Sequence, residues 1–428
     1  MRTLAVLALS LVVSLVAAGS GGAVQASPST PSSVAGDVRE LAEAIENFHP
    51  APFRHVSRAR FRAEVNRLVR TLPAATPNEQ LVALMRLVAL LGPHNGHTAL
   101  FPLDPEHRRE LHAYPVRLYA FADGVFVVDE AGDAGLTGLR LLEIGGVPVE
   151  RALELVAPLV ARDNDWSLRG WAPPYALVPE ILDGLGIVDG TGPQPFTFAR
   201  ADGRRVVVEL APVTGSTYAR TFADPHHGHY PAALPRRAKP MFVAGSSRPL
   251  YVRTLAGGRV VYVGYNSVFA PTEKAAARVS QLARSPLFRR VVVDVRLNGG
   301  GNNGTYGPLL RALRSPRVDR SGRLFLLTDR ATFSAAANFA ADVERSTRVV
   351  VVGEPTGGGV ETYGDTASVP LVATGLNVRI AMEYHHRKRG PRDRRLAVYP
   401  DVGVDLRSSD FFAGRDPVLA RALSGIGR

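Results

Sequence analysis

Two stretches of this 428-residue chain hold residues that could do chemistry. DVRLNGGG joins an apolar run to a glycine turn, and TDRATFSAA places Ser334 at the expected first turn of a helix. The first N–H groups of a helix have no intrahelical partners and favour a developing negative charge, so Ser334 is a candidate nucleophile. The N–H groups of Gly300 and Ala335 are candidates for an oxyanion hole. Alternatively, Ser334 or Thr332 is only a helix cap and the glycines an ordinary loop.

The elements that must position these residues can be predicted from the hydrophobic pattern. Residues 290–294, 324–327 and 349–352 are apolar without alternation, which indicates buried strands. Residues 334–345 predict a helix with one apolar face. Strand, helix and strand in this order predict parallel pairing with right-handed crossovers. Both candidate stretches then fall at the carboxyl ends of strands, where such sheets carry their chemistry.

The ordered motifs DVRLNGGG, TDRATFSAA and VVGEPTGGG resemble the core of the tail-specific (C-terminal processing) serine proteases, peptidase family S41. The spacing back from G-E-P-T places the family's serine on Ser334. This resemblance implies an α/β fold, with a ClpP/crotonase-like catalytic core, an N-terminal helical cap and a PDZ-like β-rich domain. It also implies a polypeptide substrate and no cofactor. The residues that match D-x-R-x-N-x-G-G are Asp294, Arg296, Asn298, Gly300 and Gly301.

The sequence departs from the bacterial members of that family at the general base. Those proteases follow G-E-P-T with x-G-K, and the lysine is the base, whereas Gly359 occupies that position here. The chain has only three lysines, Lys239, Lys274 and Lys388, so a Ser–Lys dyad of that type is not expected.

A histidine is the expected substitute. The branch without the lysine, which resembles the tricorn core protease, uses a histidine from an N-terminal motif, and HNGHT supplies His97 here. An imidazole with a near-neutral pKa can accept the serine proton. Alternatively, His97 caps a helix end or packs beneath a loop. His94 lies nearby, but no third ligand stands at a suitable spacing, so no metal site is predicted.

The third member of the triad is assigned to Asp393. The same branch places an acidic residue shortly before its G-V-x-P-D segment, which LAVYPDVGVD resembles, and that position falls near Asp393. Its carboxylate could orient the imidazole, or it could simply pair with Arg394 or Arg395. Glu354 and Glu383 are the alternatives.

Composition, the hydrophobic pattern and the family resemblance together predict five regions. Residues 1–26 have the form of a signal peptide, with Arg2 before an apolar stretch, and 27–34 are a Pro/Ser linker. Residues 35–110 predict the helical cap, 111–213 the PDZ-like domain with a helical insertion, and 214–428 the catalytic core. Within the core, 214–249 is expected to be loop, 260–265 the first strand and 378–382 a further strand. This organisation predicts a secreted protein.

Charge and composition limit the partners. The absence of cysteine excludes disulfides and cysteine-based zinc sites. The net charge is +12, but the densest basic cluster, 385–395, contains no aromatic residue, which argues against nucleic acid. Association with an acidic cell surface stays open. The sequence does not predict the oligomeric state.

The leading interpretation is a secreted serine-type endopeptidase that uses Ser334, His97 and Asp393. The first alternative is a catalytically inactive binding protein on the same scaffold, as in the retinoid-binding relatives of the family. The second is an esterase that acts on small acyl groups.

Overall fold

The computed structural model describes residues 33–222 and 239–425. The predicted signal peptide, most of the predicted linker and the histidines at 226, 227 and 229 therefore lie outside the described residues. Among the described residues, no helix has both the length and the apolar character needed to cross a membrane.

Three helices form the N-terminal part, namely α1 (Val34–Phe48), α2 (Arg58–Thr71) and α3 (Pro77–Ala89). Each begins where a hydroxyl side chain accepts a hydrogen bond from a backbone N–H of the first turn; the three caps are Ser33, Ser57 and Thr76. Their apolar faces pack into one core with the β-rich part that follows. The loop after α3 carries the HNGHT motif.

The second part is built on an antiparallel sheet with the strand order β2-β3-β4-β6-β7. Its strands are β2 (Val116–Phe121), β3 (Gly124–Glu130), β4 (Arg140–Ile144), β6 (Gln194–Ala199) and β7 (Arg205–Leu210). Between β4 and β6 the chain forms the short strand β5 (Val147–Pro148) and the helices α4 (Val149–Val156), α5 (Asp165–Tyr175) and α6 (Pro179–Gly184). The predicted helical insertion corresponds to α5 and α6. Short strands β1 (His112–Ala113) and β8 (Val213–Thr214) pair at the base of this part.

The C-terminal part holds a six-stranded sheet with the order β16-β13-β12-β11-β10-β9. Strands β10 (Val260–Tyr265), β11 (Arg290–Asp294), β12 (Leu324–Thr328), β13 (Val350–Gly353) and β16 (Val402–Gly403) are parallel. Helices α9 (Glu273–Leu282), α10 (Gly307–Leu313) and α11 (Ser334–Ser346) lie between successive strands in the chain, and α11 is buried from Ala335 to Glu344. The predicted parallel sheet is therefore present.

The beginning of this sheet differs from the prediction. Strand β9 (Leu250–Leu255) precedes β10 and pairs with it antiparallel, so β10 is not the first strand of the core. The segment predicted as loop also contains two short helices, α7 (Gly215–Thr221) and α8 (Met241–Ala244). The prediction failed because β9 is an edge strand whose residues are at most partly buried, which leaves no continuous apolar run.

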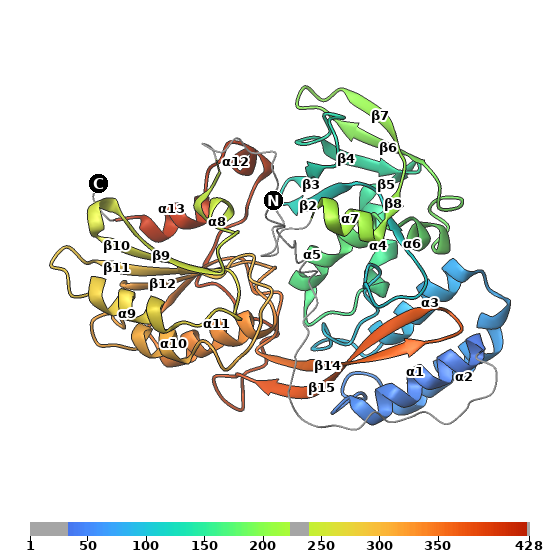
Figure 1. Cartoon of the computed structure of the whole chain (residues 1–428), viewed down its shortest axis with the longest axis horizontal. Helices are drawn as coiled ribbons and strands as arrows, with labels where there is room; N and C mark the ends of the chain where they lie inside the picture. Colours follow the sequence, from blue (N-terminus) through green and yellow to red (C-terminus); the bar gives the residue numbers. More distant parts are fainter. Residues whose placement is uncertain (1–32, 223–238, 426–428) are drawn as a thin grey trace, which may run out of the picture.

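A long hairpin connects the C-terminal part to the cap. Strands β14 (Glu361–Leu371) and β15 (Leu376–His386) extend from the core and lie along α1 (Figure 1). At the hairpin turn, Asp37 accepts the N–H groups of Ala373 and Thr374. The sequence predicted only a short strand at 378–382. The chain ends in α12 (Ser408–Phe412) and α13 (Pro417–Leu423).

Candidate active site

The predicted nucleophile Ser334 is the first residue of α11, at the carboxyl end of β12. Its φ angle is +50°, a left-handed value that is uncommon for a residue other than glycine. Strain of this kind is concentrated at functional sites, where the surrounding structure must hold it in place. Phe333, which precedes Ser334, is held by a hydrogen bond from its N–H to the carbonyl of Asn298 at 3.0 Å.

The glycine turn lies directly against the start of α11. A Cβ atom placed on Gly300, whose φ angle is +115°, would lie 2.6 Å from Ser334 Cβ and 2.9 Å from the N atom of Ala335. Only glycine permits this approach. The structure thus brings together Gly300, Ser334 and Ala335.

The two predicted oxyanion donors differ in their present bonding. The N–H of Ala335 has no acceptor among the described residues, as expected at a helix start. The N–H of Gly300 instead donates to Asn298 Oδ1 at 2.9 Å. Asn298 also donates its Nδ2 to the carbonyl of Tyr265, so this side chain fixes the glycine turn against β10. The neighbouring N–H of Gly301 has no acceptor among the described residues.

Asp329, which directly follows β12, joins the glycine turn to the nucleophile loop. Its carboxylate accepts N–H groups from Leu297 at 3.3 Å and from Ala331 and Thr332 at 3.0 Å. Leu297 also has a left-handed φ of +64°. Burial raises the pKa of Asp329 to about 6, and the charge of Glu354 acts in the same direction. The sequence analysis did not single out Asp329, because a carboxylate after a strand gives no signal of the turns that it stabilises.

The predicted base His97 lies beside the nucleophile loop. Its ring stacks on the ring of Phe333, with centroids 4.5 Å apart and an interplanar angle of 23°. A Cβ on the preceding Gly96 would lie 3.0 Å from Phe333 Cζ, so this contact also requires glycine. The N-terminal loop therefore reaches the residue next to Ser334 by ring packing.

The surroundings of the His97 ring favour its neutral form. Burial lowers its pKa below the ordinary 6.5, and the nearby His385 adds to this, whereas Asp163 and Asp365 raise the pKa. Its Nδ1 is buried without a hydrogen-bond partner among the described residues. No hydrogen bond joins the ring to the Ser334 hydroxyl in this structure; such bonds are often formed only when substrate binds.

No hydrogen bond joins Asp393, the predicted third member of the triad, to His97 among the described residues. The Asp393 carboxylate accepts from Arg395 Nε at 3.0 Å and Nη2 at 2.9 Å, and from the N–H of Arg389. The hydrogen bond from Arg395 is the main reason that the pKa of Asp393 lies well below its usual range. Arg395 also pairs with Glu344 of α11.

The two alternatives to Asp393 have different surroundings. Glu354 is buried and pairs with Arg330, and Glu383 is exposed on β15. Neither forms a hydrogen bond with His97.

The position that holds lysine in the bacterial proteases is tightly enclosed. A Cβ on Gly359 would lie 2.3 Å from the carbonyl oxygen of Glu361. The N–H of Gly359 donates to Asp163 Oδ2 at 3.0 Å. The neighbouring Gly358 lies against the nucleophile, since a Cβ there would be 3.0 Å from the N atom of Ser334.

One cluster in the described residues has the composition of a metal site. Ligand atoms of Asp365, Glu383 and His385 lie within 4.8 Å of one another on the β14–β15 hairpin. His385 Nε2 already pairs with Asp365 Oδ2 at 2.8 Å. Asp365 and His385 also act on His97, so this cluster lies close to the candidate base.

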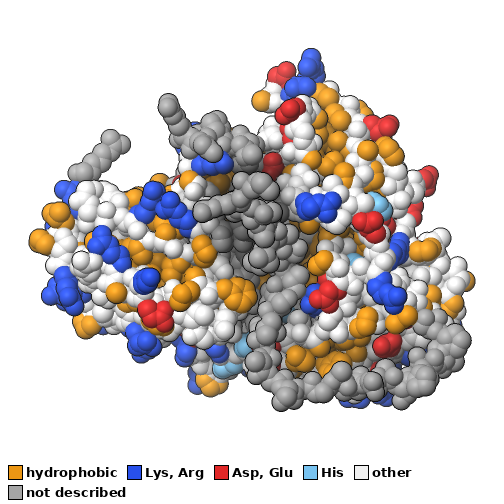
Figure 2. All heavy atoms as spheres, viewed as in Figure 1, with side chains coloured by type: hydrophobic (Ala, Val, Ile, Leu, Met, Phe, Trp, Pro, Cys, Tyr) orange, Lys and Arg blue, Asp and Glu red, His pale blue; other side chains and the backbone are white. Residues whose placement is uncertain are grey.

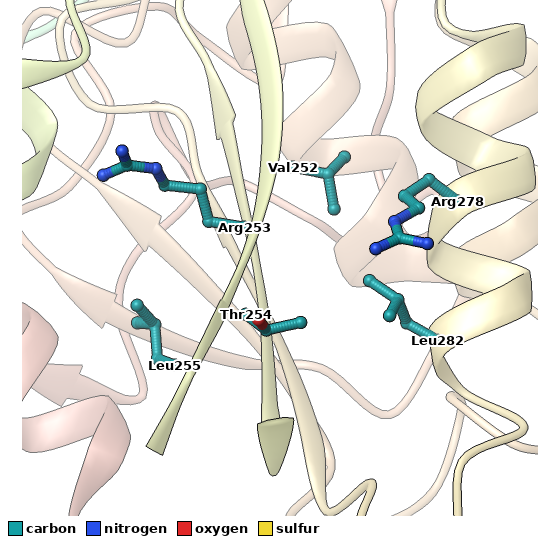
Figure 3. A pocket seen from close by; sticks show the side chains of 6 residues that line it. All are labelled: Val252, Arg253, Thr254, Leu255, Arg278 and Leu282. Atoms are coloured by element: carbon teal, nitrogen blue, oxygen red, sulfur yellow. The ribbon is translucent and has the colours of Figure 1, made fainter. Parts of the chain in front are cut away.

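A surface hollow of the described residues lies away from the candidate site. It measures about 350 Å³ and is formed between β9 and α9 (Figure 3). Its lining contains none of the candidate residues: Val252, Arg253, Thr254, Leu255, Arg278 and Leu282. The active-site assignment therefore rests on side-chain geometry and not on a large cavity.

Comparison with known protein families finds one match. Residues 303–404, which include Ser334, match the model described as Peptidase family S41. This part of the chain is similar to the S41 peptidases. The recognition made from the three ordered motifs is confirmed, and so is the assignment of the chain as a peptidase. No curated protein sequence matches the chain.

Solved structures show how far the fold of this chain is shared. Mature CPAF covers 92% of this chain and 98% of its own, with a TM-score of 0.61 and 14% identity. CPAF complexed with lactacystin covers 89% and 95%, with a TM-score of 0.61 and 13% identity. The photosystem II D1 C-terminal processing protease covers 91% and 99%, with a TM-score of 0.42 and 15% identity. The likeness to CPAF confirms the predicted mixed α/β fold, and the PDZ-like domain stays a prediction.

Proposed function

We propose that this protein is an exported serine endopeptidase in which Ser334 is the nucleophile and His97 the general base. In the proposed reaction, Ser334 Oγ attacks the carbonyl carbon of a peptide bond while its proton passes to the His97 ring. The ring then gives this proton to the leaving amine, and the C–N bond breaks. Water hydrolyses the acyl-enzyme by the same steps and frees Ser334.

The negative charge that develops on the carbonyl oxygen requires donors that are already in place. The N–H of Ala335 at the start of α11 has no protein acceptor among the described residues and is one such donor. The glycine turn supplies the second. Gly300 would have to release its bond to Asn298 for this role, or Gly301 would donate in its place. Asp393 stays a prediction as the third member of the triad.

One observation carries this proposal. The imidazole of His97 stacks on Phe333, the residue immediately before Ser334, although the two segments are 236 residues apart by number (333 − 97 = 236). A loop histidine that served only to cap a helix would not need this contact. Ser334 itself adopts a strained φ of +50° at the edge of the sheet where parallel folds carry their chemistry.

A serine-directed fluorophosphonate probe tests the proposal. We expect labelling of wild-type protein at Ser334, none in Ser334→Ala, and a rate lower by about 10²- to 10⁴-fold in His97→Ala, the range for loss of a general base. Circular dichroism of both variants controls for folding. Labelling that does not depend on His97 would refute its role as base.

Labelling of the same protein, together with hydrolysis assays, distinguishes the competing functions. Protein that is folded but neither labels nor hydrolyses peptides would favour the catalytically inactive binding protein. Protein that labels and hydrolyses small acyl esters, but no member of a peptide library, would favour the esterase.

Export is proposed on the sequence alone, from the positive start, the apolar stretch and the small residues before position 27. N-terminal sequencing of protein recovered from the medium tests it, and an N-terminus at Met1 would argue against removal of a signal peptide. Polypeptide substrates follow from the peptidase family. Association with an acidic cell surface is also proposed; Figure 2 shows Lys and Arg side chains spread over the visible face and not gathered into one patch.

A further inference from the structure

The segment from Arg162 to Asn164, just before α5, lies where the three parts of the protein meet. Asp163 is completely buried, and its two carboxylate oxygens bind different loops. Oδ1 accepts the N–H of Gly96, which directly precedes His97, at 2.8 Å. Oδ2 accepts the N–H of Gly359, in the loop that packs against Ser334, at 3.0 Å. One carboxylate thus joins the loop of the base to the loop beside the nucleophile.

The residue after Asp163 anchors the same segment to the core. Asn164 donates its Nδ2 to the carbonyl oxygens of Thr356 at 3.1 Å and of Gly357 and Leu396 at 3.0 Å. Its Oδ1 accepts the N–H groups of Trp166 and Ser167 and so caps α5. On the other side, the N–H of His94 donates to the Asp163 carbonyl at 3.2 Å. Hydrogen bonds to the histidine loop and to the core loops therefore fix the backbone on either side of the Asp163 carboxylate.

We propose that Asp163 is a positioning residue for His97: its carboxylate fixes the histidine loop against the nucleophile loop and supplies the negative charge that the imidazole faces. The inference rests on the proposed function for its link to activity. It names a residue that neither the motifs nor the family match assigns, and it gives this role to a residue outside the catalytic core.

The charges around His97 single out Asp163. The charged or titratable groups that act on the pKa of the ring are Asp163, His385 and Asp365, and among them Asp163 has the largest effect; the backbone of Tyr363 also raises this pKa. Asp365 is paired with His385, which opposes it. Asp393 is neutralised by Arg395. Asp163 is therefore the carboxylate best placed to stabilise an imidazolium formed during the reaction.

The hydrogen bonds explain why a carboxylate is needed at this position. Two N–H groups point at its two oxygens, and an ionised carboxylate can accept both. An amide has only one oxygen, so Asp163→Asn would direct an NH₂ group at one of the two donors. The variant would lose the charge and loosen one of the two loops with almost no change in side-chain volume.

The experiment is a pH titration of ¹³C-labelled histidines by NMR in the full chain, with His97 assigned through His97→Ala. In Asp163→Asn we expect His97 to titrate at least half a pH unit lower than in wild type. We also expect kcat for a peptide substrate to fall at least tenfold with little change in KM. A purely structural role would not move the titration of His97.

Asp37→Asn is the matched control. Asp37 is also buried and also accepts two backbone N–H groups, from Ala373 and Thr374, at the opposite end of the β14–β15 hairpin. It does not act on His97. We expect this variant to lose stability while the His97 titration stays at the wild-type value.

A folded Asp163→Asn protein with an unchanged His97 titration would overturn the inference. If that variant does not fold, Asn164→Ala takes its place, because it releases the segment from the core loops without removing the carboxylate. We then expect His97 to titrate lower and kcat to fall, and wild-type values for both would overturn the inference. The titration needs no turnover, so a wild-type protein without activity refutes the proposed function and still tests Asp163.

Discussion

At the scale of single residues, the proposed chemistry uses the imidazole of His97 as general base, where the bacterial proteases use the amine of a lysine. His97 is less basic than an ordinary histidine because burial disfavours its charged form. A base acts only when it is unprotonated, so a lowered pKa keeps His97 competent at more acidic pH. The same burial leaves Nδ1 without a partner, which makes the ring depend on the carboxylates around it.

This environment predicts the pH dependence of catalysis. Because its pKa lies below 6.5, His97 stays neutral as the pH falls to that value, and we expect kcat/KM at pH 6.5 to exceed half of its plateau. The acidic limb should lie below pH 6.5 and vanish from the residual activity of His97→Ala. The measurement is kcat/KM from pH 4.5 to 8.5, and a half-maximum at or above 6.5 would contradict the assignment of the base.

The Gly359 position predicts that the lysine mechanism cannot be restored by one substitution. Any Cβ at residue 359 would lie 2.3 Å from the Glu361 carbonyl oxygen, a backbone atom that cannot rotate away. We expect Gly359→Lys to lower the thermal midpoint and, when combined with His97→Ala, to leave activity at the residual level of His97→Ala. Gly359→Ala measures the loss of stability that a Cβ atom causes at this position without the rest of a lysine side chain. Recovery of activity in the double variant would show that the loop can open for a lysine.

At the scale of elements, the candidate site lies where the glycine turn after β11 contacts the nucleophile loop after β12. Asp329 stabilises both turns from one side, and Asn298 fixes the glycine turn from the other. Two other residues of the first motif, Asp294 and Arg296, form a buried ion pair. This pair also includes Asp416 at the start of α13. The residues of the first motif thus serve partly to hold the structure and only partly the proposed chemistry.

The close approach of Gly300 to α11 predicts the effect of a single methyl group. In Gly300→Ala the new Cβ would lie 2.6 Å from Ser334 Cβ and 2.9 Å from the Ala335 nitrogen, so it would displace the oxyanion donors. We expect kcat to fall by about 10²- to 10³-fold, the loss seen when one such donor is removed. The fall in kcat is measured with a peptide substrate, and the rate of probe labelling at Ser334 gives a second measurement.

Gly132→Ala controls for backbone strain. Gly132 has a comparable positive φ of +93°, and a Cβ there would meet nothing within 4 Å. It should lose stability through strain alone and keep its activity. Equal kinetic losses in the two variants would remove the argument for a glycine-lined oxyanion hole.

The elements were predictable where the sequence carries a local signal. Strands β10 and β11 are buried and β-branched, and their predicted bounds match the structure, whereas β9 is an edge strand without an apolar run. Most of the hairpin was missed because β14 and β15 carry polar residues within their buried stretches, which leaves neither a continuous apolar run nor a regular alternation. The nucleophile and the histidine were named through family motifs. Asp163 could not be named, because its role depends on contacts with residues 67 and 196 positions away.

At the scale of the whole molecule, the candidate site exists only because three parts of the chain are held together. The histidine comes from the cap loop, the nucleophile from the core, and Asp163 from the β-rich part. Residues that cross these boundaries are as necessary to the geometry as the reacting groups. Arg330, four residues before Ser334, is the clearest example outside the site.

Arg330 predicts how strongly the β-rich part is fixed to the core. Its guanidinium pairs with buried Glu354, donates to the carbonyl of Ala120 at 2.7 Å and lies over the ring of Tyr119 at 4.8 Å. Arg330→Met removes all three contacts and leaves the Glu354 charge buried. We expect the free energy of unfolding to fall by about 3–5 kcal/mol, the cost of breaking a buried pair.

Urea denaturation measures this loss, and two further variants locate its cause. Arg67→Met breaks an exposed pair with Glu64 and should cost at most about 0.5 kcal/mol. Arg330→Met combined with Glu354→Gln should be more stable than Arg330→Met alone, because no uncompensated charge stays buried. If Arg330→Met costs no more than Arg67→Met, the ion pair of Arg330 does not hold the two parts together. The geometry around His97 would then depend on Asp163 and its neighbours without help from this ion pair.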